Sequence, residues 1–283
     1  MQPNKAITLG DAGAAPAAAP LQRVAARRLL ALGEVATIES VAAEVPVALV
    51  YNGISHVVMM ATPQDLPDFA LGFSLSEGIL RRPSEMSELE IVELSSGIEV
   101  RMTIDRRRAA VFDIRRRNLA GRTGCGICGV DSLEAALRPL PQLRASTTPS
   151  HSAIRHALAA LPAAQRINSE THSVHAAAWA DMQGEIKLLR EDVGRHNALD
   201  KLIGAMAEAS IDPARGFAVI TSRCSMEMVQ KSVTTGIPTL VAISAPTTLA
   251  IRLAQDAGLR MIALARADSL TVYCEGAGTE GSQ

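Results

Sequence analysis

The first half of the chain alternates apolar and polar residues in short runs, which is the pattern of paired β-strands. Val47–Tyr51 and Ile54–Met60 flank Asn52-Gly53, a sequence typical of a two-residue hairpin turn. Glu90–Leu94 and Ile98–Ile104 form a second such pair around a short turn that contains glycine. The pattern therefore predicts a β-rich region with two hairpins.

A helix is predicted between the two hairpins. The stretch Thr62-Pro63-Gln64-Asp65 offers an N-cap and a proline suited to the first helical turn. Apolar residues then recur at the spacing of one helix face: Leu66, Phe69, Ala70 and Phe73. We expect this face to lie in the core.

In the second half, strand and helix patterns alternate, as they do in layered α/β domains. The predicted strands are Val174–Ala180, Ile186–Arg190, Phe217–Thr221, Thr239–Ile243, Met261–Leu264 and Leu270–Tyr273. The predicted helices are Ser152–Ala160, Asn197–Met206, Met226–Thr234 and Thr247–Ala257. Apolar runs without interruption, such as Phe217-Ala218-Val219-Ile220, are typical of strands covered on both faces. We predict an α/β fold, with a layered α/β core and a smaller N-terminal β-rich α+β region.

Pro139, Pro141 and the cluster Thr147-Thr148-Pro149-Ser150 mark a linker between the halves. Residues 1–20 are rich in Ala, Pro and Gly, which is the composition of a disordered tail. The predicted organisation is a disordered or extended tail (1–40), the β-rich region ending in a cysteine loop and its helix (41–145), the α/β core (146–275) and a C-terminal tail (276–283).

Composition excludes several classes of protein. The formal net charge of −1 argues against general affinity for nucleic acid or membrane surfaces. Aromatic residues make up 2%, too few for base-stacking platforms. No apolar run could span a bilayer, and Gly33-Glu34 interrupts the stretch that an export signal would need after Arg27-Arg28. We expect a cytoplasmic protein without nucleic-acid or membrane partners.

Two of the four cysteines, Cys125 and Cys128, lie three residues apart and are surrounded by three glycines. The glycines let the backbone turn tightly and leave the sulfurs uncrowded. Asp131 and Glu134 then predict the start of a helix, whose positive N-terminus favours a thiolate over a thiol. The loop is therefore predicted to perform sulfur chemistry.

A zinc site and a structural disulfide are the alternatives for this cysteine pair. A four-sulfur zinc site would need a second close pair, but Cys224 and Cys274 are isolated in the sequence. A stable disulfide is not expected in a chain without secretory features.

Eight arginines precede the cysteine loop: Arg101, Arg106, Arg107, Arg108, Arg115, Arg116, Arg117 and Arg122. Such runs are common on solvated edges, and charged edge strands protect a sheet from unwanted pairing. Their position before the cysteines supports the alternative of a wall that faces an anion. The sequence leaves both interpretations open.

Polar residues gather where the predicted strands of the second half end. The four segments are Glu191–Asn197, Thr221–Arg223, Ser244–Thr247 and Arg266–Ser269. In open α/β sheets, ligands bind beyond the carboxyl ends of strands, where helix N-termini offer free N–H groups to phosphates. This predicts an anion or nucleotide pocket, and its candidate residues are Arg195, His196, Thr221, Ser222 and Ser244.

Several motifs place the chain beside a known family. They are Asn52-Gly53 with Thr62-Pro63, Gly72-Phe73 with Ser76-Glu77-Gly78, Cys125–Gly129, Val174–Ala177, Glu191–Lys201, Glu227–Lys231, Gly236–Pro238 and Ser244–Thr247. Together they cover residues 44–273 in order, and the string EDVGRHNALDK at Glu191–Lys201 is highly specific. The chain resembles the FdhD family, the formate dehydrogenase accessory sulfurtransferases.

The resemblance implies a cytidine-deaminase-like α/β core, a homodimer and a sulfur carrier. Such a carrier takes persulfide sulfur from a cysteine desulfurase and passes it to a molybdenum or tungsten cofactor, the bis(molybdopterin guanine dinucleotide) form, before insertion into formate dehydrogenase. By resemblance, Cys125 carries the persulfide, and Cys128 is the second thiol. The guanine dinucleotide is expected at Leu264, Ala265, Arg266, Ala267, Asp268 and Ser269, where Ala267 and Ser269 replace a glycine and a second basic residue usual in the family.

The resemblance does not extend to deaminase chemistry. Zinc deaminases carry His-x-Glu followed by Pro-Cys-x-x-Cys, and the glutamate transfers protons. Here Ala177 stands in place of that glutamate, Gly124 stands in place of the proline, and the cysteine pair precedes His175. Without the acid/base group we expect no hydrolytic deamination and no catalytic metal.

Two functions therefore compete. In the first, the chain relays persulfide sulfur, and the arginines draw an anionic cofactor towards the loop. In the second, it is a non-enzymatic chaperone for a nucleotide cofactor, and its cysteine pair holds zinc or nothing. His196 is either a cofactor ligand or a hydrogen-bonded core histidine. We interpret Cys224 as a passenger packed near the pocket.

Overall fold

The computed structural model describes residues 7–9, 19–105, 107–109, 139–266 and 268–278 of the 283-residue chain. Several predictions lie outside these residues. They concern the cysteine pair, the helix predicted after it, and five of the eight arginines: Arg106, Arg115, Arg116, Arg117 and Arg122.

The second half of the chain forms a six-stranded mixed sheet in the order β13-β12-β11-β10-β8-β9. Its strands are β8 (His175–Asp181), β9 (Ile186–Asp192), β10 (Gly216–Ile220), β11 (Thr239–Ala242), β12 (Arg260–Ala263) and β13 (Thr271–Glu275). β10, β11 and β12 run parallel, whereas β8, β9 and β13 are antiparallel to their neighbours. The six strands predicted for this half are confirmed, with small shifts at their ends.

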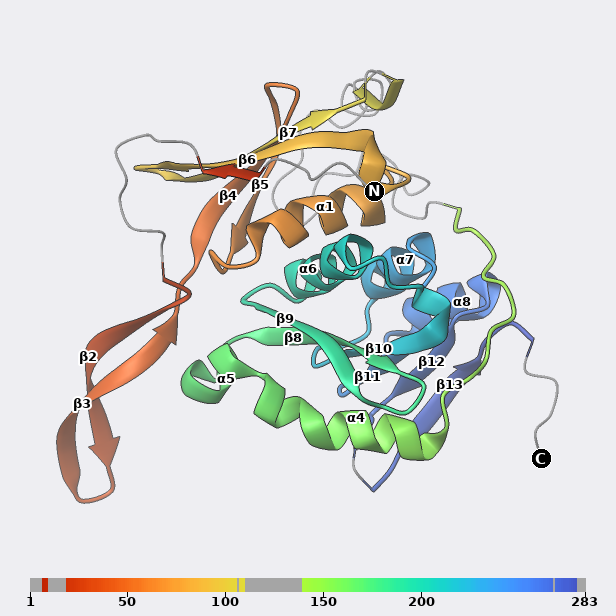
Figure 1. The fold of residues 1–283 in the computed structure, drawn as a ribbon. Coiled ribbons are helices and arrows are strands. Elements are labelled where there is room, and N and C mark those ends of the chain that lie inside the picture. Colours follow the sequence, from red (N-terminus) through yellow and green to blue (C-terminus); the bar gives the residue numbers. More distant parts are fainter. Residues whose placement is uncertain (1–6, 10–18, 106, 110–138, 267, 279–283) are drawn as a thin grey trace.

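Helices cover both faces of this sheet (Figure 1). α4 (His151–Ala164) packs on one face; α6 (Arg195–Glu208), α7 (Met226–Thr234) and α8 (Thr248–Ala257) pack on the other. Along β10, Phe217 and Val219 contact the α4 side, and Ala218 and Ile220 contact the opposite side. This double coverage explains the uninterrupted apolar run. None of the helices in the described ranges is long and apolar enough to cross a membrane.

The first half forms a five-stranded sheet in the order β1-β6-β7-β4-β5. Its elements are β1 (Ile7–Leu9), β4 (Val45–Tyr51), β5 (Ile54–Ala61), β6 (Met86–Leu94) and β7 (Gly97–Ile104), with the short helix η1 (Pro83–Glu85) before β6. α1 (Leu66–Ser76) lies between this sheet and α6 (Figure 1). The predicted apolar face of α1 is buried against the sheet, which confirms both hairpins and the helix between them.

α1 begins later than the sequence predicts. Its N-cap is Asp65, in a left-handed conformation, and the proline in its first turn is Pro67 rather than Pro63. Thr62 instead contacts the second half of the chain: its backbone N–H donates to Asp192 Oδ2 at 3.0 Å, and its hydroxyl accepts from the N–H of Val193 at 3.2 Å. A contact between distant segments overrides the local capping pattern.

Residues 21–42 form a hairpin that projects from the body (Figure 1). Its strands are β2 (Leu21–Leu30) and β3 (Gly33–Ala42), and near its base Ser40 Oγ lies 3.4 Å from Glu170 Oε2 on α5 (Arg166–Thr171). Within the disordered or extended tail predicted over residues 1–40, the part from Leu21 onward is extended and forms this strand pair. Gly33 permits the reversal at the tip with a φ of 135°. We refer to residues 21–42 as the arm.

Candidate functional site

One edge of the six-stranded sheet brings the predicted polar segments together. β9, β10, β11 and β12 end at this edge, and β8 and β13 begin there. His175, the first residue of β8, pairs with Asp192, the last residue of β9. After β10, the N–H of Thr221 donates to the carbonyl of Ala176 at 3.0 Å. We call this region the carboxyl edge.

Thr221 and Ser222 use their hydroxyls within the protein. Thr221 Oγ1 accepts from the backbone N–H of Ala176 at 2.9 Å, which fixes the end of β10 to the start of β8. Ser222 is buried, and its Oγ donates to the carbonyl of Arg223 at 3.1 Å. These hydroxyls shape the carboxyl edge, and their direct contact with a ligand stays a prediction.

The segment after β12 turns sharply at Leu264. This residue adopts a left-handed backbone with a φ of 50°, and its side chain is exposed. Its N–H donates to the carbonyl of Ser244 at 3.2 Å, which joins the ends of β12 and β11. Such backbone strain costs about 1–3 kcal/mol and clusters at binding sites. The strained position falls inside the segment predicted to hold the guanine dinucleotide.

The remaining residues of that segment have different surroundings. Ala265 is buried in the core on the α4 side. Arg266 directs its guanidinium to the carbonyls of Ile243 and Ala265, the latter at 2.9 Å, so it braces the turn. Asp268 and Ser269 are exposed, and Ala267 lies outside the described residues. Asp268 and Ser269 are therefore accessible to a ligand, as are the exposed side chains of Leu264 and Arg266.

α6 and α7 both begin at the carboxyl edge without a side-chain cap. Their N-cap residues are Gly194 and Ser225. α8 differs, because Thr247 Oγ1 accepts from the N–H of Ala250 at 3.3 Å. An uncapped helix start leaves N–H groups and a positive dipole end available to an anion.

Three side chains at these two helix starts carry buried polar atoms that have no hydrogen-bond partner in the described structure. They are Arg195 Nε, His196 Nε2 and Ser225 Oγ. Buried polar atoms in proteins are nearly always satisfied by protein, water or ligand. The donor set therefore fits a bound polar or anionic group such as the phosphates of a nucleotide.

Burial, together with the Arg195 and Lys231 cations, lowers the pKa of His196 to about 4 against the opposing charge of Glu227. Glu227 Oε1 lies 4.0 Å from His196 Nε2. At neutral pH this imidazole is therefore uncharged, and it can hydrogen bond to a ligand without adding positive charge. Burial and Arg195 also lower the pKa of His175.

Two further residues at this edge, His175 and Glu227, escaped the sequence-based assignment, and Arg223 was included only as part of the polar segment Thr221–Arg223. His175 is half-buried at the start of β8, Arg223 is exposed after β10, and Glu227 lies in the first turn of α7. Each directly adjoins a strand end or a helix start. That position is the signal from which they could have been predicted.

Much of the specific string Glu191–Lys201 serves a structural purpose instead of lining the pocket. The carboxylate of Glu191 accepts from the N–H groups of Ile167 and Asn168, both at 2.8 Å, at the start of α5. Asn197 Nδ2 donates to the carbonyl of Met60 at 2.8 Å, across to the first half of the chain. The polar side chains of Glu191 and Asn197 are thus already used within the fold.

A buried cluster of charges joins α1 to α6 and α7. Lys231 Nζ donates to both carboxylate oxygens of Asp200 at 2.9 Å and to Glu77 Oε1 at 3.0 Å. Ser76 Oγ lies 2.6 Å from Asp200 Oδ1. Burial raises the pKa of Asp200 to about 6, against the opposing attraction of Lys231. The cluster fixes the helices on which the carboxyl edge depends.

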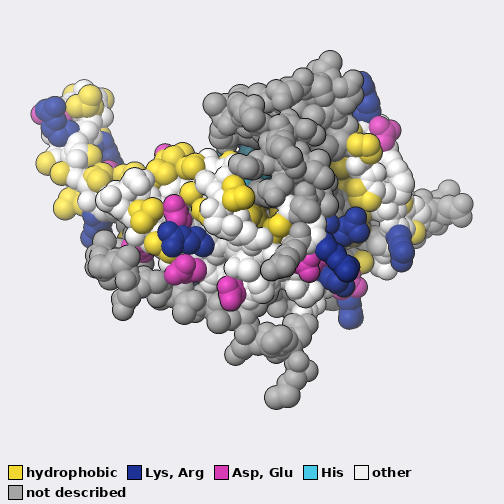
Figure 2. All heavy atoms as spheres, turned by 90° about the horizontal axis from the view of Figure 1, so that it is seen from above, with side chains coloured by type: hydrophobic (Ala, Val, Ile, Leu, Met, Phe, Trp, Pro, Cys, Tyr) yellow, Lys and Arg dark blue, Asp and Glu magenta, His cyan; other side chains and the backbone are white. Residues whose placement is uncertain are grey.

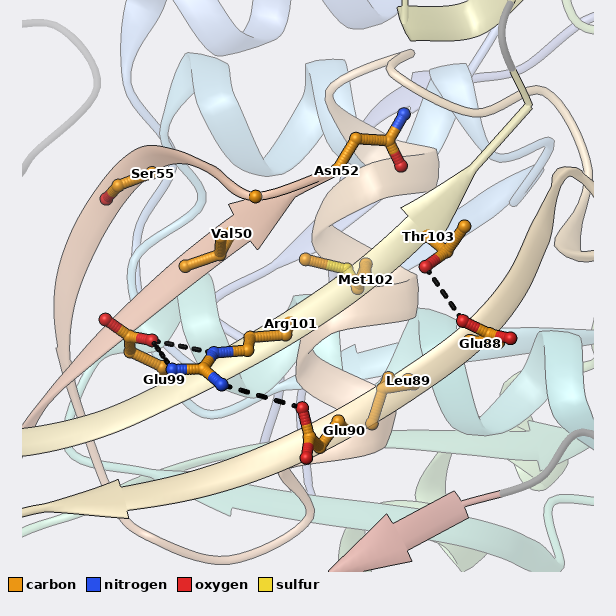
Figure 3. Close-up of a pocket in the computed structure, with 11 residues that line it drawn as sticks. Val50, Asn52, Ser55, Glu88, Leu89, Glu90, Glu99, Arg101, Met102 and Thr103 are labelled. Atoms are coloured by element: carbon orange, nitrogen blue, oxygen red, sulfur yellow. Dashed lines mark hydrogen bonds and ion pairs between the residues drawn. The ribbon is translucent and has the colours of Figure 1, made fainter. Parts of the chain in front are cut away.

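The described arginines of the predicted anion-facing wall are mostly paired with carboxylates. Figure 3 shows Arg101 on the N-terminal sheet, in a pocket of about 740 Å³, with its guanidinium 2.8 Å from Glu99 and 3.7 Å from Glu90. Arg108 Nε lies 3.2 Å from Glu85. At Arg101 and Arg108 the guanidinium charges are thus already paired within the protein, and Arg101 lies on β7, the central strand of its sheet, not on a sheet edge.

Cys224 is fully buried in the core beneath α7 and α8. Burial, together with the nearby Cys274, raises the pKa of its thiol to about 12. A thiol in this environment is inert, which agrees with its interpretation as a packed passenger. Over the described ranges, no three His, Cys, Asp or Glu side chains lie close enough together to hold a metal ion.

The architecture is that of a layered α/β protein, and known proteins share it. A crystal structure of a putative formate dehydrogenase accessory protein from Desulfotalea psychrophila has the same fold, with a TM-score of 0.72 and 22% identity. The match covers 90% of this chain and 96% of that one.

Curated relatives are much more similar in sequence. The sulfur carrier protein FdhD of Xanthomonas euvesicatoria pv. vesicatoria (strain 85-10) is 55% identical over 242 residues, which are 85% of this chain and 86% of the relative. The protein of the same name from Bordetella petrii is 48% identical over 235 residues, 83% and 84% of the two chains. The model of the FdhD/NarQ family matches residues 42–278. The chain therefore belongs to the FdhD/NarQ family.

Proposed function

We propose that this protein is a sulfur carrier that serves formate dehydrogenase. The observation that carries the proposal is its 55% identity, over 85% of its length, to a sulfur carrier protein FdhD. The family match over residues 42–278 spans both the cysteine pair and the carboxyl edge. The open helix starts and unpartnered donors at that edge add support for an anionic ligand.

Loading is a transfer between two cysteines. The thiolate of Cys125 attacks the terminal sulfur of a persulfide on a cysteine desulfurase. The desulfurase cysteine leaves as a thiolate, and Cys125 becomes a persulfide without net oxidation. The glycines around the pair favour this step, because they leave the attacking sulfur accessible to a partner protein.

Delivery has two possible routes. In one, the thiolate of Cys128 attacks the inner sulfur of the Cys125 persulfide, which releases the outer sulfur as sulfide and leaves a Cys125–Cys128 disulfide. A thiol reductant then restores the pair. In the other, the outer sulfur of the Cys125 persulfide passes directly to the acceptor, whose metal in its reduced state would supply the electron pair; the S–S bond breaks, Cys125 leaves as a thiolate, and no disulfide forms.

The proposed acceptor is a molybdenum or tungsten bis(molybdopterin guanine dinucleotide), bound as substrate before its insertion into formate dehydrogenase. The starts of α6 and α7 would hold its phosphates, together with Arg195 and the exposed Arg223. His196, Ser244 and the segment Leu264–Ser269 would contact the rest of the nucleotide. In this proposal the protein works as a homodimer.

The competing function is a cofactor chaperone whose cysteine pair binds zinc or nothing. Incubation with a cysteine desulfurase and cysteine, followed by intact mass measurement, separates the two functions. The proposal predicts a gain of one sulfur per chain, lost in Cys125→Ala and kept in Cys128→Ala. Bound zinc without added sulfur would support the chaperone. Sulfur on Cys128 in the Cys125→Ala protein, with formate dehydrogenase maturation intact, would reverse the two cysteine roles.

A further inference from the structure

His196 and Glu227 face each other across the starts of two helices. His196 is the second residue of α6, and Glu227 is the second residue of α7. His196 Nε2 is buried and lies 4.0 Å from Glu227 Oε1, and each of the two side chains is 20% exposed. This distance is too long for a hydrogen bond. The two groups are therefore close but not joined, at a place where both helices have free N–H groups.

Charges of both signs surround the imidazole of His196. Arg195 on α6 and Lys231 on α7 are cations, whereas Glu227 on α7 and Glu77 at the end of α1 are anions. Burial and the two cations outweigh the two carboxylates, and together they hold the pKa of His196 at about 4. With these groups alone the imidazole is uncharged at neutral pH. A further negative charge nearby would favour its protonation.

A phosphate bound at the two helix starts would supply that charge. The buried Arg195 Nε and Ser225 Oγ have no partner among the described residues and fit an anion there. On the face shown in Figure 2, basic side chains mostly lie beside acidic ones, so local donors have to attract the anion instead of a broad basic surface. At an effective dielectric constant of about 20, one charge about 4 Å away changes the proton affinity of a group roughly a thousandfold. A change of this size brings the protonation of His196 close to neutral pH.

Protonated His196 would lie between two anions, the phosphate and the Glu227 carboxylate. We propose that binding of a diphosphate at the starts of α6 and α7 is coupled to the uptake of one proton by His196, and that Glu227 is the positioning residue that stabilises the protonated ring. The proton comes from solvent and stays on the imidazole, and no covalent bond to the ligand forms. This inference rests on the proposed function, because it takes the diphosphate of the guanine nucleotide as the ligand.

The coupling gives Glu227 a role at an anion site, where a carboxylate alone would repel the ligand. Because the liganded protein binds more protons than the unliganded protein, the affinity for the diphosphate rises as the pH falls through neutrality. At higher pH the ring of His196 loses its proton, and Glu227 then remains as a negative charge beside the phosphate. The site therefore holds the nucleotide more tightly on the acid side of neutrality and releases it more readily on the alkaline side.

The test measures proton uptake with the full chain and GDP. Calorimetry at pH 6.5 in two buffers that differ in ionisation enthalpy gives the number of protons taken up per bound GDP. The wild-type protein should take up about half to one proton more than His196→Gln, since the phosphate of GDP contributes equally to both. His175→Gln removes another half-buried imidazole of the carboxyl edge, and His151→Gln removes an exposed one. Both should keep the wild-type uptake.

The pH profile of GDP binding tests Glu227. Between pH 8.5 and pH 6.5 the affinity of the wild-type protein should rise about threefold more than that of Glu227→Gln, because the carboxylate favours the protonated ring. At pH 8.5 Glu227→Gln should bind GDP more tightly than the wild-type protein, since a repelling charge is gone. A merely structural role of Glu227 would instead weaken binding by the same factor at both pH values. Circular dichroism checks that each variant is folded.

Several results would overturn the proton coupling. They are equal uptake by His196→Gln and the wild-type protein, loss of uptake in His175→Gln, the same pH profile for Glu227→Gln as for the wild-type protein, and no binding of GDP. Sulfur loading of Cys125 is a separate readout, because GDP binding needs no persulfide. Proton uptake without sulfur loading would refute the sulfur carrier alone, and sulfur loading without proton uptake would refute this inference alone.

Discussion

Lys201 and Asp192 form an ion pair that solvent does not reach. Lys201 Nζ lies 2.7 Å from Asp192 Oδ2, and both side chains are 0% exposed. Both residues also contact Thr62: Lys201 donates to its carbonyl at 2.9 Å, and Asp192 accepts from its N–H at 3.0 Å. Because Thr62 precedes α1, the pair holds the N-terminal region against the α/β core.

Removing the lysine should therefore be costly. In Lys201→Met, Asp192 stays buried without its cation, and loss of one partner from a buried pair typically costs about 3–5 kcal/mol. Urea unfolding of the two proteins measures the difference. Lys187→Met is the control, because Lys187 pairs with Asp181 and Glu185 at the surface, and its removal should have no measurable effect. Equal stability of Lys201→Met and the wild-type protein would show that this ion pair does not hold the N-terminal region against the α/β core.

The crossing of α1 and α6 gives a second prediction. A Cβ on Gly72 would lie 1.7 Å from the carbonyl oxygen of Asp200, and one on Gly204 would lie 1.9 Å from that of Asp68. Gly72→Ala must separate the helices and should cost about 3 kcal/mol. The control, Gly53→Ala, meets nothing within 4 Å and pays only about 1 kcal/mol for its left-handed backbone. Thermal unfolding that ranks Gly53→Ala as the more harmful change would refute the close crossing.

Local periodicity explains which parts of this fold the sequence could predict. The alternation on β10 and the apolar face of α1 depend only on neighbouring residues, so they were predictable. The arm was not, because Leu21–Ala42 looks like a tail unless its strands are paired with each other. The role of Thr62 was also hidden, since a threonine before a helix is usually a cap, and only the distant Asp192 gives it a different purpose.

The candidate site was predictable to a similar extent. Strand ends and helix starts gave the carboxyl edge, and Arg195 and His196 lie there as predicted. The sequence could not separate these residues from the nearby Glu191, whose carboxylate accepts hydrogen bonds from backbone N–H groups at the start of α5. Proximity in sequence groups charged residues, but burial and backbone partners decide which of them remain for a ligand.

His196 should make the fold less stable in acid. Its pKa is about 4 in the folded protein, below the ordinary value of 6.5. The unfolded chain therefore binds more protons between these values, and stability present above pH 6.5 is lost as the pH falls towards 4, by about 3 kcal/mol. The free energy of unfolding, measured with denaturant from pH 7 to pH 4, should change less steeply with pH for His196→Gln than for the wild-type protein. His151→Gln, at an exposed position, should keep the wild-type slope; identical slopes for His196→Gln and wild type would disprove this linkage.

Cys224 should resist alkylation. Its thiol is fully buried and has a pKa of about 12, so almost no thiolate exists at pH 8. Iodoacetamide should modify Cys125 or Cys128 first, as tryptic mass spectrometry at short times would show. The same reaction in urea is the control, because unfolding exposes all four cysteines. If Cys224 in the folded protein is modified before Cys125 and Cys128, the assignment of the reactive thiols to the cysteine pair is wrong.

The carboxyl edge should bind GDP more tightly than ADP. Both share the diphosphate that the starts of α6 and α7 would hold, so the preference must come from the base and its contacts with Leu264–Ser269. Arg195→Met should weaken both nucleotides about tenfold, the loss of one charged hydrogen bond, and leave their ratio unchanged. Arg155→Met, on the α4 face of the sheet, should change neither affinity. Ser269→Lys, which restores the second basic residue usual in the family, should tighten both. Calorimetry measures all of these, and equal or absent binding of GDP and ADP would rule out a guanine-specific site at this edge.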